Sequence, residues 1–229
     1  MVPGKVGIGI TTHNRQAVAL AVLNRWRDFT TDEMLVVVDD ASKQPFPDAT
    51  FRFENNVGIS VAKNKCLELL DSCEHIFLSD DDCFPLVSDW ADKYISPGIL
   101  HLCFTFPNLH NGLNNERGFI KTEGGLSYYK QPCGCLLYIH HDCLDVVGGM
   151  DTGYKMWGFE HVDYSQRIYN AGLTPHPFID IEDSLSVFCS LDYYGKVRSA
   201  SWDGRIKHQH SNVKRYYANI NSNSYHPYK

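Results

Sequence analysis

Three short runs in the first part of the chain are apolar at consecutive positions instead of alternating ones. They lie within residues 5–12, 33–42 and 75–79. Consecutive apolar residues indicate strands that are buried on both faces, as in a parallel sheet covered by helices. The segments between the runs place apolar residues at helical spacing. This alternation predicts an α/β fold with a mostly parallel sheet flanked by helices.

Polar residues follow each of these strands at the point where it ends. The three clusters lie at 11–15, 39–42 and 80–82, and the last is a run of three aspartates. In open α/β sheets, ligands bind in the crevice at the carboxyl ends of the strands. Adjacent carboxylates are costly for stability, but they suit a Mg²⁺ or Mn²⁺ ion that bridges the protein to a nucleotide diphosphate. The less specific interpretation is a solvated turn.

The segment "WGFEHVDYSQR" at 157–167 is predicted to begin a helix. On a helix, Glu160, Asp163 and Arg167 share one face. Two carboxylates at a helix start suit a general base beside an aromatic ring. The alternative is an ordinary helix start, where acidic residues favour the helix dipole and Asp163 pairs with Arg167.

The remaining elements are predicted from glycines, prolines and apolar runs. We expect a strand at 98–106, a hairpin or mobile loop at 107–130, a strand that runs into a short turn at 134–144, and a helix at 159–173. Gly172 closes that helix.

Composition places the chain among ordinary soluble proteins. Its 229 residues are 43% hydrophobic and 21% charged, which suits one compact domain. We find neither an apolar run of about 20 residues nor a signal cleavage site, so we expect a cytoplasmic protein, in the host cytoplasm if a phage encodes it. The eight cysteines include no CxxC pair, and we expect them to be reduced and buried.

The last residues differ in charge from the rest of the chain. Residues 204–229 contain no acidic residue but several basic ones and tyrosines. We predict a domain at 1–203 and a basic, tyrosine-rich extension at 204–229. Basic residues among aromatic ones can bind nucleic acid, but tails of this kind are usually solvated and partly disordered, which is the interpretation we favour.

Five segments taken in order resemble one enzyme family. They are "GIGITTHNR", "VVVDDAS", "NNVGISVAKN", "FLSDDDCFP" and "GGMDTGYKMWGFEHVD". Together they resemble nucleotide-sugar glycosyltransferases of the GT-A fold, especially the inverting family-two type, and the last segment is similar to the galactosyltransferase version. The resemblance spans about residues 5–175. Lys63 stands where the family usually has arginine, and His161 stands where inverting members usually have the aspartate base.

The resemblance implies a role for each matching residue. The aspartates would form a DXD metal motif, with either Asp80 and Asp82 or Asp81 as ligands. A histidine near the C-terminus would complete the site, and we expect His208 and His210 to lie on one side of an extended segment. The implied donor-binding residues are Thr11, Asn14, Arg15, Asp40, Asn56, Lys63, Asp80, Gly149 and Trp157. The implied metal ligands are Asp80, Asp81, Asp82, His208 and His210, and the implied catalytic residues are Glu160, His161 and Asp163.

The expected activity is a metal-dependent transfer of sugar from a nucleotide diphosphate sugar, UDP-linked by expectation, to an acceptor hydroxyl. The metal would be Mn²⁺ or Mg²⁺, and the acceptor a glycan or lipid-linked saccharide. One alternative acceptor is a hydroxymethylated pyrimidine in DNA, reached through the basic extension. A second alternative is a non-catalytic nucleotide-sugar binder, which His161 permits. A nucleotidyltransferase would need a glycine-rich loop that "TTHNRQ" lacks.

Overall fold

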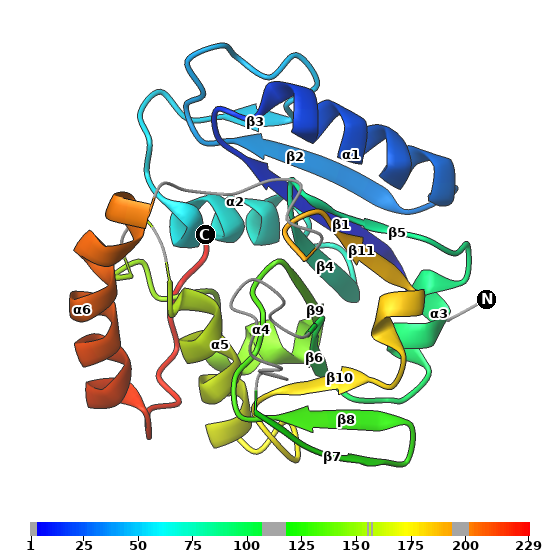
Figure 1. The fold of residues 1–229 in the computed structure, drawn as a ribbon, viewed down its shortest axis with the longest axis vertical. Coiled ribbons are helices and arrows are strands. Elements are labelled where there is room, and N and C mark those ends of the chain that lie inside the picture. Colours follow the sequence, from blue (N-terminus) through cyan, green and yellow to red (C-terminus); the bar gives the residue numbers. More distant parts are fainter. Residues whose placement is uncertain (1–3, 107–117, 155, 157, 194–201) are drawn as a thin grey trace.

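A six-stranded sheet forms the centre of the molecule (Figure 1). The computed structural model describes residues 4–106, 118–154, 156, 158–193 and 202–229, with side chains omitted at 202–207 and 209. The strand order is β3-β2-β1-β4-β9-β6, and β3, β2, β1 and β4 run parallel while β9 is antiparallel to both neighbours. The predicted mostly parallel sheet is therefore confirmed. The strands are β1 (Val6–Thr12), β2 (Met34–Asp39), β3 (Phe51–Arg52), β4 (His75–Asp80), β6 (His101–Cys103) and β9 (Leu136–His140).

Helices cover both faces of this sheet, which explains the consecutive apolar residues of its strands. Helix α1 (Gln16–Phe29) packs with Ile8 and Ile10 of β1 on one face, and α2 (Ile59–Leu69) packs with β2 and β4 on the other. Gly9 faces α2, where an added Cβ would lie 2.6 Å from the Cβ of Cys66. The glycines in "KVGIGI" therefore let α2 approach the sheet closely.

Two helices extend the α2 side of the sheet. Strand β9 leads directly into α4 (His141–Val147), where sequence analysis expected only a turn. The helix forms because Cys143, Leu144 and Val147 share a buried face. Helix α5 (Glu160–Asn170) follows a loop and begins where it was predicted.

Small sheets complete the other side of the molecule. Strands β7 (Phe119–Glu123) and β8 (Leu126–Tyr129) form the expected hairpin, and residues 107–117 lie outside the described part. The order of this sheet is β10-β8-β7. The remaining elements are β5 (Cys83–Pro85), α3 (Trp90–Ile95), β10 (Ile179–Ile181), the short 3₁₀ helix η2 (Ser184–Ser186) and β11 (Phe188–Ser190).

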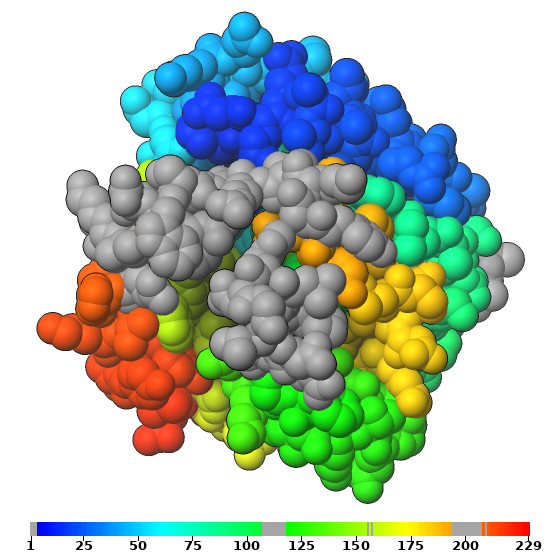
Figure 2. Space-filling view, in the orientation of Figure 1, coloured from blue at the N-terminus to red at the C-terminus, as the bar shows by residue number. Residues whose placement is uncertain are grey.

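Much of the C-terminal extension is helical, so the expectation of a partly disordered tail was wrong, although most of its described side chains are exposed as expected. Residues 202–219 form helix α6, and the predicted boundary between 203 and 204 falls inside it. Arg215 donates from Nε to Asp151 Oδ2 at 2.7 Å, and Tyr228 donates to Asp71 Oδ1 at 2.7 Å. The extension has no acids of its own because its partners lie in the main domain. In Figure 2, α6 forms one margin of the face in view.

All eight cysteines are free and buried, as predicted. Within the described part of the chain, every helix is too short or too polar to cross a membrane.

Candidate active site

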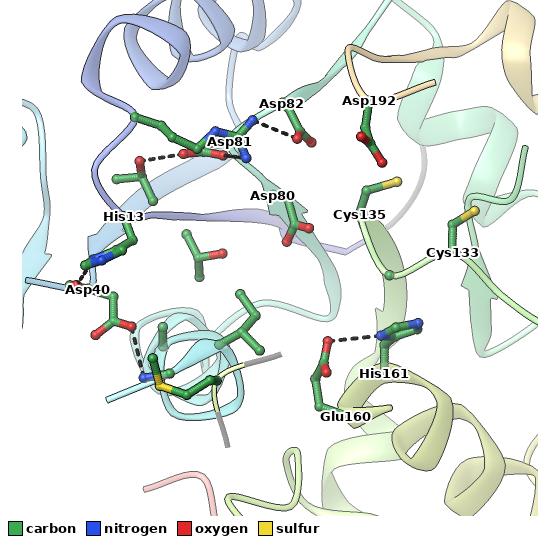
Figure 3. A pocket seen from close by; sticks show the side chains of 18 of the residues that line it. His13, Asp40, Asp80, Asp81, Asp82, Cys133, Cys135, Glu160, His161 and Asp192 are labelled. Atoms are coloured by element: carbon green, nitrogen blue, oxygen red, sulfur yellow. Dashed lines mark hydrogen bonds and ion pairs between the residues drawn. The ribbon is translucent and has the colours of Figure 1, made fainter. Parts of the chain in front are cut away.

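A cavity of about 580 Å³ lies at the carboxyl ends of the parallel strands. Figure 3 shows the three aspartates across it from Glu160 and His161, with His13 and Asp40 at one side. The polar clusters that follow the three strands therefore meet at one place. The described residues that line the cavity and carry polar side chains are Thr11, Thr12, His13, Arg15, Asp40, Asn56, Asp80, Asp81, Asp82, Cys133, Cys135, Glu160, His161, Asp192 and His208.

Arg15 holds two of the aspartates. Its guanidinium contacts Asp81 Oδ1 at 3.0 Å and Asp82 Oδ2 at 2.8 Å, while Thr12 donates to Asp81 Oδ2 at 2.6 Å. Burial raises the pKa of Asp81 to about 7, although Arg15 opposes that shift. Both oxygens of Asp81 are therefore occupied by protein groups. Arg15 lines the cavity, but its charge is directed at the aspartates.

Lys63 supports Asp80 from beneath the cavity. Its ammonium lies 3.0 Å from Asp80 Oδ1 and donates to the carbonyl of Gly134 at 2.7 Å. Burial by itself would lower the pKa of Lys63. The carboxylates of Asp80 and Glu160 have the larger effect, so the pKa of Lys63 is raised. Lys63 is 1% exposed and is not among the described lining residues. The structure therefore gives no support to the expectation that Lys63 faces the donor's ribose or diphosphate.

Some buried oxygens of the site lack a partner. Among the described residues, Thr11 Oγ1, Asp82 Oδ1 and Glu160 Oε2 are buried without a hydrogen bond. A buried carboxylate oxygen without a partner is costly unless a ligand or cation meets it. Asp82 Oδ1, next to Asp80 and on the cavity, therefore fits an oxygen ligand for a hard divalent cation.

Asp40 and Asn14 shape the loops at the rim. Asp40 accepts from the backbone N–H groups of Val57 at 2.7 Å and Gly58 at 3.0 Å, just before α2. Asn14 accepts from Lys43 N at 2.7 Å and is exposed, outside the described cavity lining. Asp40 lines the cavity as predicted, whereas Asn14 joins two rim loops and is not in the expected position to touch a donor.

His13 lines the cavity, and sequence analysis did not select it. Its ring nitrogens lie 3.2 Å from Asn56 Nδ2, and Nδ1 contacts the carbonyl of Asp40. His13 could have been selected because it lies within "TTHNR", the polar segment at the end of the first strand. His13 connects the first and second polar clusters.

Glu160 and His161 are joined by a hydrogen bond at the start of α5. His161 Nδ1 lies 3.0 Å from Glu160 Oε1. Burial opposes the charge of Glu160, but His161 and Lys63 together lower its pKa to about 2. Gly134 faces the imidazole, and an added Cβ there would lie 2.5 Å from His161 Nδ1. The absence of a side chain at residue 134 therefore leaves room for the ring.

Two other predicted residues are structural. Asp163 accepts from Arg167 Nε at 2.9 Å and from the Tyr154 hydroxyl at 3.0 Å. Gly149 packs where an added Cβ would lie 2.6 Å from Tyr228 Cβ. Neither is among the described lining residues. Both oxygens of Asp163 are bound in the core, and Gly149 packs against the C-terminal segment.

The two histidines near the C-terminus are separated. They lie on α6, not on an extended segment, so that expectation was wrong. Residues two apart on a helix point about 200° apart, and His208 lines the cavity whereas His210 is exposed. Trp157, a predicted donor contact, lies outside the described residues.

Residues 133–135 line the cavity although their "CGC" sequence suggested only buried thiols. Strand β9 is antiparallel to β4, so its start lies beside the end of β4, and Asp80 N donates to the carbonyl of Cys135 at 2.7 Å. Phe106, Met156 and Asp192 also line the cavity and were not predicted.

The chain is similar to known glycosyltransferases. The family model for the N-terminal domain of galactosyltransferase matches residues 121–188. An uncharacterized glycosyltransferase of Acanthamoeba polyphaga mimivirus is 26% identical over 208 residues, which cover 79% of this chain and 78% of the relative.

Two solved structures share the fold. A mannosyltransferase from Pyrobaculum calidifontis in complex with GDP-Man and Mn²⁺ has a TM-score of 0.66 at 17% identity, over 95% of this chain and 65% of that one. GalNAc-T7 with UDP, GalNAc and Mn²⁺ has a TM-score of 0.62 at 14% identity, over 78% of this chain and 42% of that one. The chain thus spans less than two thirds of both solved proteins. The chain therefore has the GT-A fold of these solved proteins, and the family model and the viral relative that it matches are both glycosyltransferases.

Proposed function

We propose that the chain transfers a sugar from a nucleotide diphosphate sugar to an acceptor hydroxyl in the cavity described above, with a divalent cation held by the aspartates. The observation that carries this proposal is the buried Asp82 Oδ1, which has no partner among the described residues and lies on the cavity beside Asp80. The complexes of the two solved proteins, with GDP-Man or UDP and with Mn²⁺, support the same donor class. We expect a UDP-sugar as the donor and a glycan or lipid-linked saccharide as the acceptor.

The contacts favour Asp80 and Asp82 over Asp81 as metal ligands. Asp81 uses one oxygen for Arg15 and the other for Thr12, whereas Asp82 uses only Oδ2 for Arg15. His208, which lines the cavity, could add a nitrogen ligand, and nitrogen favours Mn²⁺ over Mg²⁺. When bound, the cation would neutralise charge on the leaving diphosphate.

The nucleoside would contact the opposite rim. His13, Asp40 and Asn56 line it and are tied to each other by hydrogen bonds. Thr11 Oγ1 is buried there without a partner among the described residues and is suited to donate to, or accept from, a ribose or base. Rigid polar groups of this kind orient a ligand with little entropic loss on binding.

His161 is the proposed general base. Glu160 lies at its Nδ1 and would hold the proton there, which leaves Nε2 to accept the proton of the acceptor hydroxyl. Glu160 also stabilises the imidazolium that forms, because its own pKa is held at about 2 and it stays ionised. The histidine thus takes the place of the family's usual aspartate, with a buried carboxylate behind it.

A donor panel tests the proposed function. UDP-, GDP- and dTDP-sugars are incubated with the protein and Mn²⁺ or EDTA, and released nucleoside diphosphate is measured. Release from one donor should require the metal and fall at least about 100-fold in Asp82→Asn. Asp142→Asn, on an exposed side chain of α4, is the control. Binding of a donor without turnover would reject the transferase and favour a non-catalytic binder.

DNA is not proposed as the acceptor. That alternative depended on an open basic extension, but Arg215 pairs with Asp151, and Lys229 pairs with Asp71 at 2.6 Å. These contacts consume positive charge that would otherwise face phosphates.

A further inference from the structure

A second cluster of metal-binding side chains lies at the far end of β4. One ligand atom each from Glu74, His75 and His140 lies within 4.8 Å of the others. His75 is the first residue of β4 and Asp80 is the last, so the cluster is about 16 Å from the aspartates. It is therefore separate from the proposed active site.

The sheet register brings the two histidines together. His75 and His140 are direct partners in the antiparallel β4–β9 pair, and directly opposed residues project from the same face. Their ring centroids are 5.2 Å apart. Glu74 precedes β4, and its Oε1 lies 3.5 Å from His140 Nε2 and 4.0 Å from His75 Nε2. Ligands on tetrahedral zinc, with bonds of about 2.0 Å, are about 3.3 Å apart. The three ligand atoms, within 4.8 Å of one another, must therefore approach by up to about 1.5 Å, and the half-exposed Glu74 can supply part of that movement.

A polar group lies beside the outer nitrogen of each imidazole. His75 Nδ1 is 3.0 Å from the Tyr138 hydroxyl, and His140 Nδ1 is 3.4 Å from Asp142 Oδ2. A proton on each Nδ1 would leave both Nε2 lone pairs directed at Glu74. Asp142 N now donates to His140 Nδ1 at 3.2 Å. With a proton on Nδ1, His140 would lose that hydrogen bond and donate one to the Asp142 carboxylate instead. Such outer partners orient histidines that bind metals.

Gly4 packs directly against the cluster. An added Cβ at this position would lie 3.0 Å from His75 Nε2 and would overlap Glu74 Oε2, and the φ of Gly4 is +111°. Only glycine adopts this backbone conformation readily and leaves room for the Glu74 carboxylate beside His75.

We propose that Glu74, His75 and His140 bind a zinc ion that links the start of β4 to the end of β9. Two imidazole nitrogens and one carboxylate oxygen are a donor set that zinc prefers, whereas Mg²⁺ prefers oxygen alone. The ion has a structural role, because it joins neighbouring strands at the sheet end opposite the proposed active site. It stabilises the folded chain by binding that state more tightly than the unfolded one.

Titration with zinc tests the site. The EDTA-treated and dialysed protein is titrated with Zn²⁺ in excess Mg²⁺, which occupies oxygen-rich sites, and binding is followed by calorimetry and thermal unfolding. We expect one ion with a Kd below about 10 μM and a higher Tm, with affinity at least tenfold lower in Glu74→Gln and His140→Ala.

Matched controls separate this site from others. His141→Ala removes the neighbouring histidine, whose ring faces Asp145 at 3.9 Å, and should keep wild-type affinity. Asp82→Asn should also keep it, because the aspartates lie at the other end of β4. Wild-type affinity in both Glu74→Gln and His140→Ala, or binding no tighter than millimolar, would overturn the proposal. Glu74 is half-exposed, so its variant is expected to fold even if His140→Ala does not.

Discussion

The Lys63 ammonium lies 3.0 Å from Asp80 Oδ1 in a side chain that is 1% exposed. This ion pair joins α2 to the end of β4, directly beneath the cavity, and the Asp80 side chain is 32% exposed. Removing one partner of such a pair leaves the other charge uncompensated, which is more costly than removing both. Lys63 is therefore a supporting residue for the aspartates.

Replacing Lys63 with methionine should lower the free energy of unfolding by about 1–3 kcal/mol, because Asp80 Oδ1 is left without its cation although the side chain is 32% exposed. Urea unfolding at neutral pH measures the change. Lys63→Met with Asp80→Asn should recover much of the loss, since neither charge remains. A loss below about 1 kcal/mol in the single variant would show that the pair is not a stabilising contact.

Acid should reduce the stability that Glu160 provides. Its folded pKa is about 2, below the value of about 4.3 in an unfolded chain. Such a group contributes stability above the unfolded pKa and loses it as pH falls through the folded one, with a total of about 3 kcal/mol. The difference in unfolding free energy between wild type and Glu160→Gln should shrink from pH 4.5 toward 2. A difference that does not change over this range would argue against the contact with His161.

The strands and the position of the site could be predicted from the sequence because both depend on short patterns of neighbouring residues. Consecutive apolar residues indicated strands covered on both faces, and polar residues at the ends of parallel strands meet at one edge. The three aspartates and Glu160 with His161 all line the cavity.

Side-chain pairings could not be predicted in the same way. Arg167 binds Asp163, so the Asp163 carboxylate that suggested chemistry instead holds the core together, and Lys63 is directed at Asp80 and not at the cavity. The antiparallel direction of β9 brings 133–135 to the cavity, and no local pattern in "CGC" encodes that direction. The helical conformation of α6 likewise separates His208 from His210.

Gly134→Ala should impair catalysis through His161. An added Cβ would lie 2.5 Å from His161 Nδ1, so the ring must move away from Glu160. We expect kcat to fall by about 100-fold or more, the range for loss of a general base, with a smaller change in the donor KM. Steady-state kinetics of the transfer reaction measures both. In a His161→Ala background the same substitution should cost little further activity or stability. If Gly134→Ala lowered activity as much in the His161→Ala background as in the wild type, the added Cβ would clash with a group other than the imidazole.

Helix α6 should depend on Arg215 for its attachment to the main domain. The guanidinium donates twice to Asp151, at 2.7 and 2.9 Å, and the Asp151 side chain is only 5% exposed. Arg215→Ala leaves that carboxylate without its charged partner and should lower the unfolding free energy by about 1–3 kcal/mol. Lys214→Ala, at the exposed neighbouring position, should change it by less than about 0.5 kcal/mol. Thermal and urea unfolding compare the two. Equal stability in both variants would mean that apolar contacts such as Tyr216 with Phe159, at 5.6 Å between ring centroids, hold the helix without the ion pair.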